Sequence, residues 1–325
     1  MTASFRVVQT STRVPVGPSD LTVFDGLDVD FEAVHAPDER TVLEATRDAD
    51  AVLVLVEDFP RHVIENLRAA RSITRYGIGY DTIDVAAATD RGIWVTNVPD
   101  ANHREVAVHA IALALAVTRR LPALDRGIRS EGWASALAPG VHRPDVQTFG
   151  LLGLGRTGWR TAEVARALGY TVVAHDPAAV AGPDGVELVG FDELVARSDV
   201  LSLHVPLLES TRNIVDAAVL ARMRPGSVLV NVSRGGLVDE HALADALVEG
   251  HLFGAGLDAF ACEPLEADSP LRGLDSVILT PHAAHWSEES WAEVRSSALA
   301  DVARVLRGEE PRSPVNRPQP LRRVP

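Results

Sequence analysis

Three side chains that could perform acid–base and anion chemistry follow short apolar runs in the second half of this sequence. Arg234 stands in "NVSRGGLVDE", Glu263 in "LDAFACEPL" and His282 in "LTPHAAHWSEES". An imidazole exchanges protons near neutral pH, and a carboxylate beside it orients the ring. A guanidinium binds a carboxylate through two hydrogen bonds and polarises a carbonyl. With a hydride donor beside them, these groups could reduce a 2-oxo acid.

Each of the three residues also has an ordinary structural explanation. A Pro-His pair is common in turns, a Glu-Pro pair is common in loops, and an arginine before two glycines can form a surface salt bridge. Their spacing in the sequence does not show that they meet in space. However, catalytic groups gather at the carboxyl ends of parallel strands, so a parallel sheet would bring all three to one site.

A glycine-rich stretch, "FGLLGLGRTGWR" at 149–160, could bind the hydride donor. Its GxGxxG pattern falls on Gly153, Gly155 and Gly158, between an expected strand and an expected helix. In a dinucleotide site the first glycine permits a tight turn, the second lets the backbone approach a pyrophosphate, and the third lets the helix pack on the strand. The helix also offers free N–H groups to the phosphates.

Asp176 ends the next expected strand, about 20 residues after the glycines, as a dinucleotide site requires. A carboxylate at this place accepts hydrogen bonds from the adenosine ribose and repels a 2′-phosphate. No arginine follows directly in "HDPAAVAG", so the sequence favours NAD over NADP. The alternative is that Asp176 is only a turn or cap residue before Pro177.

The elements that must position these residues alternate between short apolar runs and helical patterns. In the first part, the sequence predicts strands over 5–10, 50–56, 71–77 and 92–98, with helices over 40–49 and 61–70. In the second part, it predicts strands over 146–153, 170–177, 199–205, 227–233, 254–260 and 276–280, with helices over 159–169 and 240–250. This alternation predicts an α/β protein whose parallel sheets are covered by helices on both faces.

Two further helices stand outside this alternation. A long helical segment over 103–129 joins the two parts, with a bend or interruption at Pro122. Its apolar run, 107–117, is too short to span about 30 Å of hydrocarbon, so we expect a buried helix at a subunit contact. Another helix covers 288–308, and the proline- and arginine-rich tail after it is expected on the surface.

Composition excludes several classes of site. The chain of 325 residues contains no lysine, which excludes a Schiff-base lysine, a pyridoxal phosphate enzyme and a GxxxxGK[ST] phosphate loop. Its single cysteine, Cys262, excludes an internal disulfide and a CxxC zinc site; we predict no metal and expect this thiol to pack as a small apolar side chain. The net charge of −14 disfavours nucleic acid and anionic membranes as partners. With no signal peptide or membrane span recognised, we expect a cytoplasmic protein.

The motifs occur together in an order that resembles one family. "LLGLGRTG", "VNVSRGGLVDE", "LDAFACEPL" and "TPHAAHWSEE" follow one another as in the D-isomer-specific 2-hydroxyacid dehydrogenases, and "RYGIGYDTIDVAAATDRGIWVTNVP" resembles the substrate loop of that family. The likeness covers nearly the whole chain and is closest to C-terminal-binding-protein-like and phosphoglycerate-dehydrogenase-like members. It implies a Rossmann NAD-binding domain, residues 102–285, inserted into a flavodoxin-like substrate domain, residues 1–101 and 286–325. The glycine turn would then come late because it begins the inserted domain.

The resemblance also implies roles for individual residues. His282 would be the general acid/base, Glu263 its partner and Arg234 the group that holds the substrate, while backbone N–H groups of Ile78 and Gly79 would bind the substrate carboxylate. The residues implied at the cofactor, besides the three glycines and Asp176, are Arg156 and Thr157 at the pyrophosphate, Val205, Pro206 and Thr211 at the adenosine, and Val232, Ser233 and Asp258 near the nicotinamide. The helical segment over 103–129 would form much of a homodimer interface.

The substrate stays open at this point. His285 and Trp286 follow His282 closely; they could narrow the pocket and give the substrate a polar contact, or they could simply pack at a hinge. We expect an NAD-dependent 2-hydroxyacid dehydrogenase that works as a 2-oxo acid reductase on a small-molecule substrate. Two alternatives use the same scaffold: an NAD(H)-sensing binding protein of the corepressor kind, and a phosphite dehydrogenase.

Overall fold

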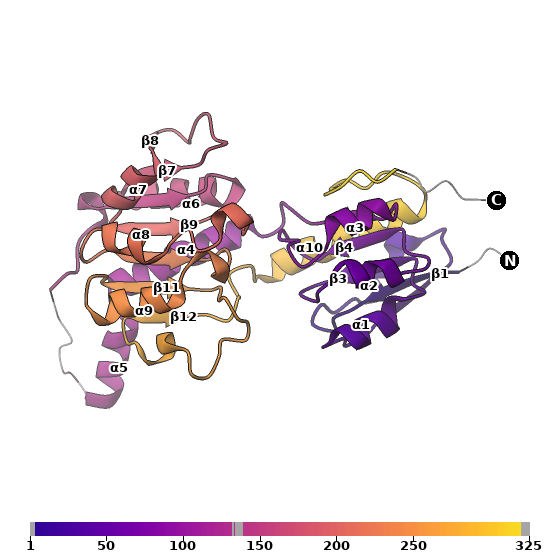
Figure 1. The fold of residues 1–325 in the computed structure, drawn as a ribbon, viewed down its shortest axis with the longest axis horizontal. Helices are drawn as coiled ribbons and strands as arrows, with labels where there is room; N and C mark the ends of the chain where they lie inside the picture. The colour runs from indigo at the N-terminus through magenta and orange to yellow at the C-terminus, as the bar shows by residue number, and fades with distance from the viewer. Residues whose placement is uncertain (1–3, 132, 134–138, 320–325) are drawn as a thin grey trace. The chain divides into compact units, whose positions relative to one another are not determined.

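The computed structural model describes residues 4–131, 133 and 139–319 of the chain. The chain forms two compact units, which Figure 1 shows. Unit 1 contains the residues up to Asn102 together with those from Ser287 onward, and unit 2 contains His103–Trp286. The end of the predicted surface tail, 320–325, lies outside the described residues.

Unit 1 contains a five-stranded sheet in which all neighbours are parallel. Its strand order, β2-β1-β3-β4-β5, is that of flavodoxin-like sheets. The strands are β1 (Phe5–Gln9), β2 (Val29–Ala33), β3 (Ala51–Val54), β4 (Ser72–Arg75) and β5 (Trp94–Thr96). The four strands predicted in this part are confirmed. The edge strand β2 was not predicted, because its sequence VDFEA carries two acidic residues and stays partly exposed.

Alternate residues of the strands supply two cores, one on each face of this sheet. The helices of unit 1 are α1 (Glu39–Thr46), α2 (Arg61–Asn66), α3 (Val85–Asp90) and α10 (Glu288–Leu306), with a short 3₁₀ helix at Asp20–Phe24. Val52 and Val54 of β3 join the core that includes residues of α1, α2 and α3. Ala51 and Leu53 join the core that includes α10. Unit 1 therefore needs two distant parts of the chain to complete its layers.

Unit 2 contains a seven-stranded sheet, also with all neighbours parallel. The strands are β6 (Thr148–Leu152), β7 (Thr171–His175), β8 (Val186–Leu188), β9 (Val200–Leu203), β10 (Val228–Asn231), β11 (Gly254–Leu257) and β12 (Val277–Leu279). Their order is β12-β11-β10-β9-β6-β7-β8, so the direction of winding reverses between β6 and β9, as in the Rossmann fold. The predicted α/β class with two parallel sheets is confirmed, whereas the short edge strand β8 was missed.

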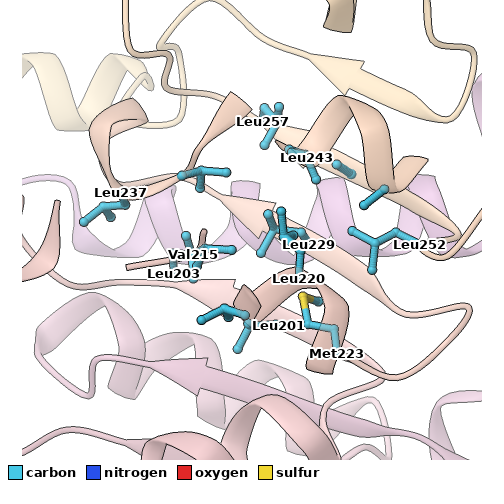
Figure 2. Packing of buried hydrophobic residues seen from close by; sticks show 14 of the residues in the cluster. Leu201, Leu203, Val215, Leu220, Met223, Leu229, Leu237, Leu243, Leu252 and Leu257 are labelled. Atoms are coloured by element: carbon cyan, nitrogen blue, oxygen red, sulfur yellow. The ribbon is translucent and has the colours of Figure 1, made fainter. Parts of the chain in front are cut away.

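Helices cover both faces of the unit 2 sheet. They are α4 (His103–Thr118), α5 (Leu121–Glu131), α6 (Arg156–Ala167), α7 (Phe191–Arg197), α8 (Ala217–Arg222) and α9 (Glu240–Val248), with 3₁₀ helices at Pro144–Val146, Glu209–Thr211, Gly235–Leu237 and Pro270–Gly273. One core joins the sheet to α4 and α6. The other joins it to α7, α8 and α9, and Figure 2 shows how Leu201 and Leu229 of the sheet lie near Leu220 and Leu243 of the helices in this core.

The helical segment predicted over 103–129 is two helices. α4 ends at Thr118 and α5 begins at Leu121, with an angle of 56° between them. Arg120 has a φ of 55° at the break. The predicted interruption is therefore confirmed, but it lies at residues 119–120 rather than at Pro122. Pro122 is the second residue of α5, where a first helical turn does not need its N–H. Within the described residues, no single helix is long and apolar enough to cross a membrane, and the bent α4–α5 pair passes that test by length and composition only.

α4 approaches β11 very closely because β11 carries glycines at the contact. A Cβ at Gly256 would lie 2.7 Å from the Cβ of Leu113, and a Cβ at Gly254 would lie 2.6 Å from Cγ1 of Val117. Leu113 and Val117 are about one helical turn apart, and the two glycines are two residues apart on the same side of the strand. Helix and strand therefore run antiparallel, and four residues of α4 match two residues of β11, about 6 Å in each.

Candidate active site

The three candidate catalytic residues follow three neighbouring strands of unit 2. Arg234 comes after β10, Glu263 after β11 and His282 after β12, and these strands are adjacent in the sheet. Because they are parallel, their carboxyl ends reach the same edge, where ligands of such sheets bind. The structure therefore places at one edge three residues whose spacing in the sequence did not show that they are close in space.

Glu263 and His282 are in direct contact. The Nδ1 atom of His282 lies 2.8 Å from Oε2 of Glu263, and the backbone N–H of Phe260 donates to the other carboxylate oxygen at 3.0 Å. The side chains of His282 and Glu263 are 39% and 38% exposed. The ring is thus held in place while the pair stays accessible from solvent.

Arg234 is placed beside this pair by its own loop. The side-chain amide of Asn231 donates to the Arg234 carbonyl at 2.8 Å. The next residue, Gly235, packs so tightly on the backbone of Phe260 that a Cβ there would overlap it. Since the N–H of Phe260 binds Glu263, the glycine at 235 brings the arginine loop directly against the carboxylate loop.

The neighbours of Glu263 favour its ionised form. Burial works toward a higher pKa of this carboxyl, but the hydrogen bonds from His282 and the Phe260 N–H, together with the charges of His282 and Arg234, outweigh burial and lower the pKa. Glu263 is therefore an ionised acceptor that orients His282.

The glycine turn has the shape that a dinucleotide site needs. Gly153 has a φ of 96°, and a Cβ there would lie 2.7 Å from the backbone of His204. A Cβ at Gly158 would overlap the carbonyl of Gly153, so α6 can pack closely only because this residue is glycine. Gly155 is the N-cap of α6 and has open space around its Cα. A phosphate can therefore approach the free N–H groups at the start of α6.

A cavity of about 850 Å³ opens beside this turn. Its lining residues are His103, Arg104, Leu154, Gly155, Arg156, Trp159, Arg160 and Glu163. Three arginines and one glutamate give this lining a positive balance, which suits the negative charge of a pyrophosphate.

Asp176 lies directly after β7 and contacts the glycine turn. Its Oδ2 atom accepts the N–H of Leu154 at 2.8 Å, and its Oδ1 atom accepts the N–H of Ala178 at 2.9 Å. The structure thus places this carboxylate next to the turn, and its bond to a ribose stays a prediction.

The other residues predicted at the cofactor come mainly from the loops after β9 and β10. The hydroxyl of Ser233 donates to the Val205 carbonyl at 2.6 Å, which joins the two loops. The Thr211 hydroxyl donates to the Pro206 carbonyl at 2.7 Å. Roles at the cofactor stay predictions for Arg156, Thr157, Val205, Pro206, Thr211, Val232, Ser233 and Asp258.

The residues predicted at the substrate are divided between the units. In unit 2, the rings of His282 and His285 meet edge to face with centroids 6.2 Å apart, and Trp286 is 67% exposed. In unit 1, Ile78 and Gly79 follow β4, and the side-chain amide of Asn97 donates to the Ile78 carbonyl at 2.7 Å. The roles of Ile78, Gly79 and His285 stay predictions.

The expectation for the single cysteine was wrong. Cys262 is exposed rather than packed among apolar side chains, because it lies in the irregular loop that follows β11 and leads to Glu263.

Three polar residues that support the site were not found from the sequence. Asn231 is 1% exposed and holds the loop of Arg234. His109 of α4 and Thr280, which follows β12, lie 3.0 Å apart through Nε2 and Oγ1. The sequence did contain a signal for each of them. Asn231 and Thr280 are polar residues at the ends of apolar strands, and His109 is a polar residue within an apolar stretch of helix, and buried polar residues usually have a hydrogen-bonding partner.

Comparison with known proteins identifies the family. Residues 111–284 match the profile described as "D-isomer specific 2-hydroxyacid dehydrogenase, NAD binding domain". The glyoxylate reductase of Korarchaeum cryptofilum is 38% identical over 289 residues, which cover 86% of this chain and 86% of that protein. The chain belongs to the D-isomer-specific 2-hydroxyacid dehydrogenase family. Its match to the NAD-binding domain, together with the glycine turn, assigns NAD as the cofactor.

The relatives of this chain within the family are named for different substrates. D-3-phosphoglycerate dehydrogenase of Mycobacterium tuberculosis is 41% identical over 286 residues, which cover 87% of this chain but only 53% of that protein. This chain thus spans about half the length of the mycobacterial relative. The solved structure of a glyoxylate reductase from Paecilomyes thermophila has a TM-score of 0.87 and 30% identity, covering 96% of this chain and 98% of that one.

We predict that Glu263→Gln changes how stability depends on pH. Folding lowers the pKa of this carboxyl, so its ionised form stabilises the fold above the ordinary pKa, and this contribution is lost as the pH falls through the lower folded value. Urea unfolding should show wild type more stable than the variant near neutral pH, with a difference that shrinks below pH 4.5, the ordinary value. Glu266→Gln in the same loop is the matched control, and the same pH-dependent loss in both variants would contradict the role of Glu263.

Proposed function

We propose that this chain is an NAD-dependent 2-hydroxyacid dehydrogenase that works as a reductase of 2-oxo acids. The observation that carries the proposal is the contact of His282 with Glu263, beside Arg234, at the carboxyl edge of a sheet of the NAD-binding type. The relatives support the same class of activity, since two of them are named as glyoxylate reductases and one as a D-3-phosphoglycerate dehydrogenase. No relative reported above supports the binding-only or phosphite alternatives.

The residues around the glycine turn would hold the cofactor. The N–H groups at the start of α6 and the guanidinium of Arg156 would bind the pyrophosphate, and Asp176 would bind the adenosine ribose. The loops that carry Val205 and Ser233 would line the rest of the dinucleotide, since a hydrogen bond joins them at the carboxyl edge of the sheet, next to the point between β6 and β9 where the winding reverses. When bound, NADH supplies the hydride that the C2 atom of the substrate accepts.

His282 would supply the proton of the reduction. The carboxylate of Glu263 can only accept hydrogen bonds, so Nδ1 of His282 carries a hydrogen whether the ring is neutral or charged. The proton that leaves the ring is therefore the one on Nε2. It passes to the oxygen of the substrate carbonyl as the hydride reaches C2, which yields a 2-hydroxy acid. Glu263 stabilises the charged ring before transfer, in the manner of a carboxylate behind a catalytic histidine.

Arg234 would bind the substrate carboxylate and polarise its carbonyl group. A guanidinium presents its donors in a plane that matches a carboxylate, and the fixed loop of Arg234 limits how far this plane can move. We also propose that the backbone N–H groups of Ile78 and Gly79 bind the substrate carboxylate, and that His285 contacts the substrate side chain.

The test is a panel of 2-oxo acids followed by the loss of NADH absorbance. The panel should include glyoxylate, pyruvate, hydroxypyruvate and phosphohydroxypyruvate. We predict that at least one is reduced, and that His282→Ala lowers kcat on it by about 100-fold or more, the usual contribution of a general acid. KM should change less than kcat, because the carboxylate is bound by other groups.

His241→Ala is the matched control, because His241 is an exposed histidine on α9. It should keep the kcat of wild type. If no 2-oxo acid is reduced while phosphite reduces NAD, the proposed reaction is wrong. If His282→Ala turns over as fast as wild type, His282 is not the proton donor.

We propose that Asp176 makes the protein prefer NAD to NADP. Its carboxylate would repel a 2′-phosphate, and juxtaposed like charges cost several kcal/mol. Asp176→Ser should therefore raise kcat/KM for NADPH relative to NADH by about tenfold or more. Asp176→Glu keeps the charge and should keep the preference. A serine variant with the cofactor ratio of wild type would remove Asp176 from this role.

We propose that the protein forms a homodimer through α4 and α5. Leu121 and Ile128 are seven residues apart on one face of α5 and are 53% and 50% exposed, and Val108 of α4 is 59% exposed. Apolar residues left exposed on one surface mark protein contacts. Sedimentation velocity should show a dimer for wild type and a monomer for Ile128→Glu, whereas Val180→Glu, at a fully exposed position, should stay dimeric. A monomeric wild type would contradict the proposal.

We also propose that the protein works in the cytoplasm. The proposed reaction consumes NADH, a metabolite that cells keep inside, and a single unpaired cysteine suits a reducing compartment. Cell fractionation with an antibody to the protein would locate it.

A further inference from the structure

His109 lies on the face of α4 that contacts β11. It is one turn before Leu113, which packs on Gly256, and Asp258 follows Gly256 by two residues. Four residues along α4 cover about the same distance as two residues along β11, and helix and strand run antiparallel. His109, four residues before Leu113, therefore lies opposite Asp258, two residues after Gly256. The atomic contact agrees, since Nε2 of His109 lies 3.6 Å from Oδ1 of Asp258. The apolar middle part of α4 thus places one polar ring at the carboxyl edge of the sheet.

The hydrogen bonds of Thr280 fix the direction of this contact. The Thr280 hydroxyl lies 2.6 Å from Oδ1 of Asp258 and 3.0 Å from Nε2 of His109. A carboxylate can only accept, so Thr280 gives its single hydrogen to Asp258. The contact with His109 then requires that Nε2 of the histidine donates to the Thr280 oxygen. The order of donation is therefore His109 to Thr280 to Asp258.

Asp258 also fixes the backbone turn that carries His282. It is 1% exposed, and its carboxylate accepts the N–H groups of Ala283 and Ala284, each at 2.9 Å. Its carbonyl accepts the N–H of His282 at 2.9 Å. His282 has a φ of 50°, a left-handed conformation that is unfavourable for a residue with a Cβ. The bonds to Asp258 offset this cost, so the direction of the His282 ring depends on the position of the Asp258 carboxylate.

We propose that His109 is a positioning residue for His282. Through the Thr280 hydroxyl it fixes the carboxylate of Asp258, and this carboxylate fixes the turn on which His282 stands. His109 acts through these two residues and not on the substrate. The kinetic part of this inference rests on the proposed function, whereas the part that concerns the turn can be measured without any reaction.

The kinetic test uses His109→Leu, which removes the donor, and His109→Gln, whose amide nitrogen can donate from a similar place. His109→Leu should lower kcat by about 10- to 100-fold, because small misplacements of a catalytic group cost that much, with a smaller change in KM. His109→Gln should recover most of the loss. Because the effect passes through Thr280, the double variant His109→Leu with Thr280→Val should be no slower than Thr280→Val alone.

The second test measures hydrogen exchange at the amides of Ala283 and Ala284. Both should exchange faster in His109→Leu and in Thr280→Val than in wild type, and His109→Gln should restore their protection. His251→Leu is the matched control: Nε2 of His251 lies 3.1 Å from the carbonyls of Leu220 and Met223. That variant should lower the melting temperature but leave kcat and the exchange of both amides unchanged.

Wild-type exchange at both amides in His109→Leu would overturn the proposal. So would an equal fall of kcat in His251→Leu, or losses of His109→Leu and Thr280→Val that simply add in the double variant. If wild type reduces no 2-oxo acid, the proposed function fails, and the exchange measurement still decides the role of His109.

Discussion

All seven strands in the described part of unit 2 run in one direction, and the candidate site depends on this constraint. Parallel strands must be joined by crossover connections, so each strand ends at the same edge with a loop that is free to carry function. Arg234, Glu263 and His282 occupy the loops after three adjacent strands, and the glycine turn occupies the loop after β6. The proposed proton donor, the proposed anion binder and the glycine turn are thus placed by one rigid sheet.

Close backbone approaches then bring these loops within contact distance. Gly235 lets the arginine loop touch the backbone of Phe260, and Gly153 lets the glycine turn touch the backbone of His204. Gly254 and Gly256 likewise allow a helix, α4, to pack closely on β11. A side chain at any of these positions would push two elements apart. The positions of the charged residues therefore depend on glycines, which have no side chain that could react.

Much of this could be predicted from the sequence, because the informative residues are local. The strand before the glycine turn, the turn itself and Asp176 lie within one short segment, and the alternation of apolar runs gave the α/β class. The edge strands β2 and β8 were missed because edge strands are half exposed and lack a continuous apolar run. His109 was missed for another reason: its partners, Thr280 and Asp258, are brought to it only by packing of α4 on β11.

The discontinuity of unit 1 has a consequence for biosynthesis. One face of its sheet is covered by α10. Val294, Ala298 and Val302 of this helix pack in the same core as Ala51 and Leu53 of β3. Unit 2 is continuous, and all its described strands leave the ribosome before α10 does, because they precede α10 in the chain. The nascent chain can therefore complete its second unit while the first still exposes an apolar sheet face, which reverses the usual order in which domains mature from the N-terminus. During that interval the uncovered apolar face is prone to aggregation and is a surface that a chaperone could protect.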